Sequence, residues 1–227
     1  METVPFVFSA AFVLLTGLAT WLFYQAAHCS PRTLFLLVAW LAGQAVLGLN
    51  GFYLTAPTTL PPRLALALLP PVLVLAGLLL TPWGRSYLLG LRLEVLTLLH
   101  TLRLAVELSL WVLYRHHLVP QLMTFEGRNW DLLAGLSAPV VYYLVFRQRR
   151  LGCQTLLGWN VVCLGLVLNI LVNALLSVPG PLQQVAFEQP NRAVLYFPFV
   201  WLPAGLVPLV LLSHAAAFCK LLRRPYS

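Results

Sequence analysis

Charged residues are scarce in this sequence. Only 9% of its 227 residues are Asp, Glu, Lys or Arg, whereas 60% are hydrophobic. A soluble domain carries about 25% charged residues, because its surface must be wetted. The shortage of charge therefore excludes an ordinary soluble protein and indicates a chain whose solvent is lipid.

Several motifs of soluble chemistry are missing as well. The chain contains no Gly-x-Ser-x-Gly, no P-loop and no Gly-rich dinucleotide turn. No pair of its four cysteines has CxxC spacing, so we expect neither a disulfide nor a metal cluster. The net charge of +8 comes from basic residues at the ends of apolar runs, not from a patch with interleaved aromatics. We therefore expect no nucleic-acid partner and no cofactor.

Apolar runs long enough to cross a bilayer, about 20 residues each, recur along the chain. There are seven of them, at 5–27, 33–54, 60–81, 91–117, 130–146, 155–178 and 194–222. The first residues, METVPFVFSA, lack the basic region of a signal peptide, so the first run is expected to be a retained helix. The sequence predicts one all-α integral membrane domain of seven transmembrane helices, within the lipid bilayer.

Basic residues predict the orientation of these helices, because Lys and Arg concentrate in cytoplasmic loops. With the N-terminus outside, the outer loops receive Arg63, Arg115, Arg128 and Arg192. The inner loops then receive Arg32, Arg85, Arg92, Arg147, Arg149, Arg150, Lys220, Arg223 and Arg224. We therefore predict an N-out, C-in protein of a bacterial-type plasma membrane, with a cytoplasmic C-terminus.

An internal repeat is a further prediction. A shift of 122 residues places Thr33-Leu34 on Thr155-Leu156, and with a larger offset Pro70 meets Pro198. Two triplets of helices around the fourth would have the same orientation, a 3+1+3 parallel repeat.

This arrangement resembles the topology of SWEET-type sugar carriers and of microbial rhodopsins, both of which have seven helices and an outer N-terminus. The likeness is one of topology alone. The only lysine, Lys220, lies at the predicted cytoplasmic end rather than where a rhodopsin holds retinal. Pro120-Gln121 lies in a predicted loop, whereas a PQ-loop carrier has it within a helix.

The fourth run, 91–117, carries the strongest candidate site. At about 100° per residue, one arc of roughly 80° contains His100, Arg103, Glu107, Trp111 and Tyr114. Charges at this depth are costly, so the stripe should face protein or water. Arg103 and Glu107, four residues apart, are close enough to pair. The stripe is then either a path for a proton or ligand, or an ion pair that only fixes helix packing.

A second candidate opens the fifth run, where Glu126, Arg128, Asn129 and Asp131 lie within six residues. Acids in the first turn favour the positive end of the helix dipole, and Asn129 or Asp131 is a natural N-cap. The alternative to capping is that Asp131 joins Glu107 in a pocket in the outer half of the bundle.

Weaker candidates lie in the last two runs. Asn169 and Asn173, spaced by four, share one face of the sixth helix and serve either hydrogen bonding between helices or the same pocket. His214, in the inner half of the seventh helix, is either a packing residue or a ligand. The loop before that helix, 183–192, is either plain solvated loop or a cap on the pocket. Prolines 198, 203 and 208 loosen the seventh helix, either as static kinks or to free carbonyls for a cavity.

Three functions remain open at this point. The first is a small-solute or proton-coupled carrier that binds a small molecule or proton in the outer half. The second is a structural or sensory membrane protein whose polar groups only hold helices together. The third is an intramembrane enzyme acting on a lipid, with Glu107 or Asp131 as acid–base and His100 as assistant. The enzyme is least favoured, because the sequence has no nucleophile and base at a spacing that indicates a catalytic pair. The sequence predicts no oligomeric state.

Overall fold

The computed structural model describes residues 4–55 and 59–223 of the chain. In this part the chain is helical and contains no strand, which confirms the all-α prediction. The α-helices are α1 (Phe6–Ala26), α2 (Pro31–Leu49), α3 (Ala65–Leu80), α4 (Pro82–Gly90), α5 (Leu93–Leu99), α6 (Leu102–Arg115), α7 (Leu132–Tyr142), α8 (Cys153–Ser177) and α9 (Val207–Leu221). Two π-helical segments extend α7 and precede α9, at Tyr143–Arg147 and Leu202–Leu206. Short 3-10 turns lie at Phe52–Leu54, Gln121–Met123 and Ala193–Leu195.

Five helical stretches of the described chain are long and apolar enough to cross a membrane. They are α1, α2, α8, the stretch Leu93–Arg115 and the stretch Leu202–Leu221. Helices α3 and α4 meet at an angle of 97°, and counting the pair as one span raises the number to six. The helical stretch Leu132–Arg147 is apolar but shorter. Five or six spans are thus supported by length and composition, and the seventh stays a prediction.

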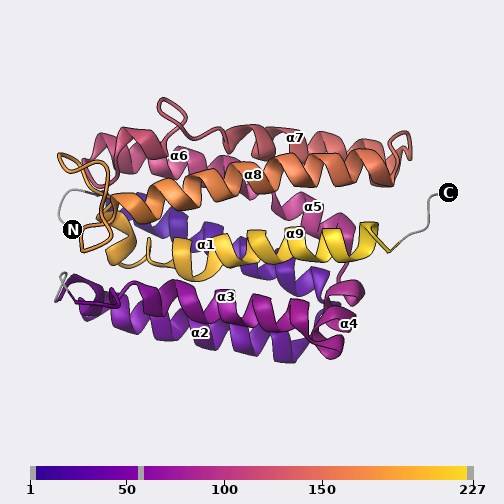
Figure 1. Cartoon of the computed structure of the whole chain (residues 1–227), viewed down its shortest axis with the longest axis horizontal. Helices are drawn as coiled ribbons and strands as arrows, with labels where there is room; N and C mark the ends of the chain where they lie inside the picture. The colour runs from indigo at the N-terminus through magenta and orange to yellow at the C-terminus, as the bar shows by residue number, and fades with distance from the viewer. Residues whose placement is uncertain (1–3, 56–58, 224–227) are drawn as a thin grey trace.

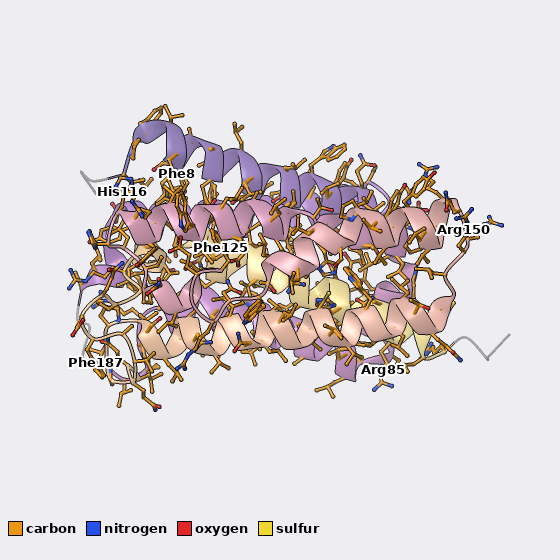
Figure 2. The ribbon with its side chains drawn as sticks, turned by 90° about the horizontal axis from the view of Figure 1, so that it is seen from above. Phe8, Arg85, His116, Phe125, Arg150 and Phe187 are labelled. Atoms are coloured by element: carbon orange, nitrogen blue, oxygen red, sulfur yellow. The ribbon has the colours of Figure 1, made fainter. Side chains whose placement is uncertain are left out.

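The long helices run side by side and form a bundle with two distinct ends (Figure 1). One end holds residues 50–55 and 59–64 and the loops 116–131 and 178–201 (Figure 1), and we call it the long-loop end. The other holds the turn after α1, helix α4, the loop after α7 and the last turn of α9, and we call it the basic end. His116 and Phe187 lie at the long-loop end, and Arg85 and Arg150 at the basic end (Figure 2).

Large apolar side chains cover the flanks of this bundle. Examples are Val7 on α1, Phe35 on α2, Leu73 on α3 and Val162 on α8, each more than half exposed. Apolar surface on this scale is unfavourable in water and is expected of helices that face lipid. The outer surface is therefore compatible with a membrane location.

Helix α9 is the most enclosed of the long helices. It lies between the group of α6, α7 and α8 and the pair of α2 and α3 (Figure 1). In the stretch Leu202–Leu221, which contains α9, 67% of the most apolar 18-residue segment is buried. In the stretch Leu93–Arg115 the corresponding share is 44%. The element that the others surround is thus the last helix rather than the charged fourth run.

The prolines before and within α9 change its backbone locally. Pro208 has no N–H, so it cannot bond the carbonyl of Ala204 four residues earlier. The Trp40 Nε1 of α2 donates to that carbonyl instead, at 2.8 Å. Trp201 Nε1 donates in return to the Leu41 carbonyl of α2, also at 2.8 Å. A carbonyl that proline leaves free is therefore satisfied by the neighbouring helix, as a buried backbone group requires.

Two breaks shape the middle of the chain. The segment 81–84, which carries turn residues, begins α4: Thr81 Oγ1 accepts a bond from the Gly84 N–H at 3.1 Å, and Pro82 occupies the first turn. Between α5 and α6, the amides of Arg103 and Leu104 bond carbonyls only three residues back, both at 3.1 Å. This tight turn contains neither proline nor glycine, and it carries His100 into the core beside α9.

Candidate functional site

Arg103 is the centre of a buried polar cluster. From the first turn of α6, its guanidinium crosses to Asp131, the residue before α7, and Nε donates to Oδ2 at 2.7 Å. Nη2 donates to the other carboxylate oxygen of Asp131 and, at 3.0 Å, to the Cys163 carbonyl of α8. Both charged side chains are less than one-tenth exposed. A two-pronged contact of this kind fits the fork of a guanidinium to a carboxylate and fixes both groups.

His214 of α9 extends the cluster toward the basic end. Its Nδ1 lies 2.9 Å from Asn160 Oδ1, while Asn160 Nδ2 donates to the Leu156 carbonyl at 2.9 Å. With the Asn160 oxygen as acceptor, Nδ1 carries the proton, and Nε2 accepts from Arg103 Nη1 at 3.4 Å. The His100 ring packs on the His214 ring with centroids 4.4 Å apart. The network thus defines one neutral tautomer of His214.

Glu107 extends the cluster in the opposite direction, toward the long-loop end. Its Oε1 accepts a bond from Asn129 Nδ2, which also donates to the Met123 carbonyl at 3.0 Å. Asn129 Oδ1 accepts from the Asp131 N–H at 3.0 Å and so joins Glu107 to the ion pair. Glu107 Oε2 is buried and has no hydrogen-bond partner. A buried polar atom without a partner is costly, and the cluster contains another such atom, His100 Nδ1.

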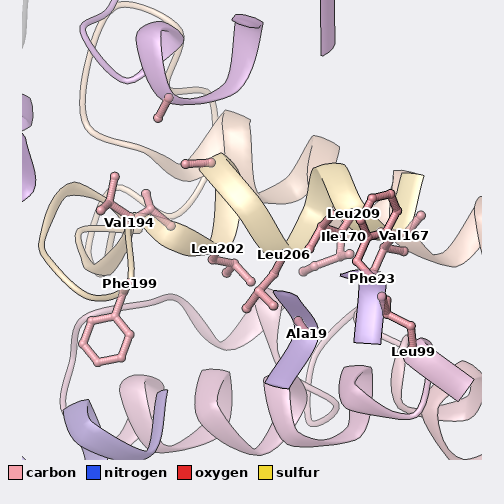
Figure 3. Packing of buried hydrophobic residues seen from close by; sticks show 14 of the residues in the cluster. Ala19, Phe23, Leu99, Val167, Ile170, Val194, Phe199, Leu202, Leu206 and Leu209 are labelled. Carbon is pink, nitrogen blue, oxygen red and sulfur yellow. The ribbon is translucent and has the colours of Figure 1, made fainter. Parts of the chain in front are cut away.

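A cavity of about 70 Å³ adjoins Glu107, and we call it the Glu107 cavity. Its polar wall consists of Arg103, Glu107, Asp131 and Asn191. The rest is apolar, including Val167, Ile170, Val194, Leu202 and Leu206, which Figure 3 shows together. One water needs about 10–15 Å³ of such space, so the cavity has room for a few waters or one small molecule.

Asn191 brings the loop before α9 into this wall. Its backbone N–H donates to the Ser177 carbonyl at 2.8 Å, which ties the loop to the end of α8. Asn191 is fully buried, and its Oδ1 has no hydrogen-bond partner. Two residues of the cavity wall, Glu107 and Asn191, therefore each have a buried side-chain oxygen that lacks a donor.

A glycine sets the distance between the two helices that form the ion pair. A Cβ on Gly135 of α7 would lie 2.5 Å from the backbone nitrogen of Leu104. Leu104 follows Arg103, so the missing side chain lets α7 approach α6 at the level of the cluster. Gly135 thus permits the short reach from Arg103 to Asp131.

A second hollow lies on the other side of Arg103. This crevice, of about 590 Å³, begins at His214 and runs between α3, α8 and α9 to Arg85 and Arg223 at the basic end. We call it the His214 crevice. The two hollows thus touch different members of the polar cluster, the Glu107 cavity at Arg103, Glu107 and Asp131 and the His214 crevice at His214.

The structure unites some of the residues expected in one pocket and separates others. Arg103, Glu107, Asn129, Asp131, His100 and His214 all lie in the buried cluster. Glu126 and Arg128 are exposed, although they belong to the same short segment. Asn169 and Asn173 do not line the Glu107 cavity: Asn169 Nδ2 donates to the Arg128 carbonyl at 2.8 Å, and Asn173 Nδ2 to the Asn169 carbonyl at 2.9 Å.

Two expected contacts are replaced by others. The pairing of Arg103 with Glu107 is wrong, because the guanidinium finds both oxygens of Asp131 across the helix interface. Asp131 occupies the N-cap position of α7 but makes no side-chain cap, since its carboxylate is turned to Arg103. An ion pair between helices thus takes the place of both local arrangements.

Sequence reasoning missed Asn160, the Cys163 carbonyl and Trp159, whose ring meets the His100 ring edge-on with centroids 5.4 Å apart. Asn160 lies nine residues before Asn169 and so is not on the face that the spacing by four selects. A main-chain carbonyl leaves no signal in a sequence at all. Within the described residues no group of three His, Cys, Asp or Glu side chains is placed to hold a metal ion.

No curated protein and no solved structure matches the chain. A family model does match, over residues 59–222, which is most of the chain and includes every residue of the polar cluster. The chain therefore belongs to the family described as Domain of unknown function (DUF8737).

Proposed function

We propose that this chain is a proton-coupled small-solute carrier that binds its solute in the Glu107 cavity. The observation that carries the proposal is that Glu107, a residue of the cavity wall, has a buried carboxyl oxygen, Oε2, without a hydrogen-bond partner. Ionisable groups inside membranes mark substrate and proton pathways more often than they serve packing alone.

The charges of the cluster support the same reading. The cluster contains two carboxyl groups, Glu107 and Asp131, and one guanidinium, that of Arg103. Both carboxylate oxygens of Asp131 already accept hydrogen bonds from Arg103. One proton on the cluster makes it neutral, and its natural place is Glu107, the carboxyl without an ion partner. A solute that donates a hydrogen bond to Glu107 would satisfy the same oxygen. A proton and a solute thus compete for the same oxygen, Glu107 Oε2, or replace each other there.

The walls of the cavity define the class of solute. They are apolar apart from Arg103, Glu107, Asp131 and Asn191, and the volume admits only a few non-hydrogen atoms beyond the donor group. Small ligands bind where apolar walls surround a few polar groups that fix orientation. The solute is therefore a small, mainly apolar molecule with one hydrogen-bond donor.

We further propose seven spans with the long-loop end outside. Each of the seven apolar runs contains a helix that runs along the bundle (Figure 1). The 16 residues of α7 and its π extension rise at most about 24 Å, a few Å less than a thin bilayer core, and local thinning of the bilayer accommodates such a short helix. Arginines and the lysine are more numerous at the basic end, which the positive-inside rule assigns to the cytoplasm. The 3+1+3 repeat stays a prediction from the sequence.

The structural alternative rests on a different observation. Every polar contact of the Arg103–Asp131 pair is made within the protein, as in an element that only fixes helix packing. This explains the pair but leaves the unpartnered oxygens of Glu107 and Asn191 without a role. An enzyme has less support, because no nucleophile lies beside Glu107 in the cavity wall.

Proton flux into liposomes tests the carrier proposal. The full chain is reconstituted with an entrapped pH-sensitive dye, valinomycin and K⁺ balance the charge, and an acid pulse is applied outside together with a small apolar alcohol as the solute. The control is Glu188→Gln, which changes an exposed acid. With the wild type or this control, we expect the liposome interior to acidify faster than in protein-free liposomes. With Glu107→Gln, we expect the protein-free rate. Equal rates in the wild type and Glu107→Gln would overturn the proposal.

A further inference from the structure

The His214 crevice combines an apolar channel with a basic mouth. Its walls are side chains of α3, α8 and α9, among them Leu75, Leu79, Leu164 and Phe218. From His214 to Arg223 it follows α9 for nine residues, about 13 Å at 1.5 Å per residue. This is the shape of a site for an extended apolar chain.

Two arginines form the mouth. Arg85 of α4 and Arg223 at the end of α9 border the crevice and also an adjoining hollow of about 240 Å³, together with Ser86. Arg85 Nε donates to the Leu79 carbonyl at 2.6 Å, so its terminal nitrogens are the donors left for an anion. Of the described residues that line the two hollows, none is acidic.

The mouth lies at the depth where lipid headgroups begin. Helix α4 turns by 97° from α3 and crosses the end of the bundle, and Arg85 is seen at this end in Figure 2. Trp83, on the first turn of α4, is 75% exposed and stacks on Tyr87. Exposed tryptophans are enriched at the membrane–water interface, which places Arg85 at headgroup level.

We infer that the His214 crevice binds an acidic phospholipid. The headgroup phosphate lies between Arg85 and Arg223, Ser86 adds a hydroxyl, and one acyl chain fills the crevice toward His214. Basic pockets between transmembrane helices on the cytoplasmic side bind anionic headgroups for the same electrostatic reason. Two arginines with no lining acid favour an anionic lipid over a zwitterionic one.

This inference does not rest on the carrier proposal. The lipid would lie on the opposite side of Arg103 from the Glu107 cavity, and its binding needs neither Glu107 nor a solute. A chain packed against His214 would also close the crevice between the polar cluster and the basic end. Bound lipid and a solute path to that end therefore exclude each other.

Native mass spectrometry of the detergent-purified full chain tests the inference with defined lipids. Phosphatidylglycerol and phosphatidylcholine with the same long chains are titrated against the wild type, Arg85→Gln/Arg223→Gln and the control Arg149→Gln/Arg150→Gln. The control removes two exposed arginines of the same end that do not line the crevice. We expect the wild type to prefer phosphatidylglycerol. The Arg85/Arg223 variant should lose about tenfold or more of that affinity, since each arginine near the surface contributes about fivefold.

Two further probes separate the contribution of the lipid headgroup to the affinity from that of the acyl chain. Phosphatidylglycerol with six-carbon chains keeps the headgroup but cannot fill the crevice, so we expect weak binding. Inorganic phosphate has the charge without any chain, so we expect it not to displace the long-chain lipid. Equal affinity for the two long-chain lipids, equal losses in the two double variants, or displacement by inorganic phosphate would each overturn the inference.

Discussion

Arg103 and Asp131 lie 28 positions apart, on either side of the loop between α6 and α7, and form a two-pronged ion pair in the core. Removing one partner from such a pair leaves an uncompensated buried charge, which costs about 3–5 kcal/mol. We therefore expect Asp131→Leu or Arg103→Met to lower the thermal unfolding temperature in detergent markedly. The double replacement, which removes both charges, should recover most of the loss.

The Arg92–Glu94 pair provides the matched control. Its side chains are 44% and 42% exposed, and exposed pairs contribute about 0–1 kcal/mol. Arg92→Gln should therefore leave the unfolding temperature almost unchanged. Equal losses for the exposed and the buried pair would contradict a structural role for Arg103 and Asp131.

The close contact at Gly135 predicts a second effect. Gly135→Ala places a Cβ 2.5 Å from the Leu104 nitrogen, so α7 must move away from α6. Overpacking of this kind costs about 1–3 kcal/mol. In Gly158→Ala, where nothing lies within 4 Å of the added Cβ, we expect no loss of stability. Thermal unfolding curves of the two variants measure this difference in stability. If Gly135→Ala were as stable as Gly158→Ala, α6 and α7 would not be in close contact at Gly135.

A third prediction concerns the carbonyl that Pro208 leaves free. Trp40→Phe removes its donor, and an unsatisfied buried carbonyl costs about 1–3 kcal/mol. Pro208→Ala supplies a backbone N–H four residues after Ala204, so the double variant should regain much of the stability that Trp40→Phe loses. Trp83→Phe, at an exposed indole, controls for the loss of a tryptophan. Strictly additive effects of Trp40→Phe and Pro208→Ala would contradict the shared carbonyl.

Much of the fold follows from the sequence because apolar runs and turn residues are local signals. The runs locate the helices, and the scarcity of charge predicts their exposed apolar flanks. The broken stretch at His100 is not predictable in this way, because the local sequence contains neither proline nor glycine. The start of α4 did have a signal, since Thr81 and Pro82 are typical of the first turn of a helix.

The candidate site was predictable in its members more than in its contacts. Helical spacing selects Arg103 and Glu107 because both lie on one face. It cannot select Asp131 as the partner, because that pairing depends on how α7 is rotated and how closely Gly135 lets it approach. Asn160 and Asn191 enter the site for the same reason, through the packing of whole elements.

One measurement tests most directly whether Glu107 binds a solute. Native mass spectrometry of the gently solubilised wild type is compared with Glu107→Gln and with Glu188→Gln. Gln at position 107 retains an oxygen that can accept the Asn129 bond, so its unfolding temperature should stay near that of the wild type.

We predict a small non-lipid adduct on the wild type and on Glu188→Gln that is absent from Glu107→Gln, and its mass would name the solute. Bare protein in all three samples, with Glu107→Gln merely less stable to heat, would contradict the claim. Glu107 would then be a packing residue.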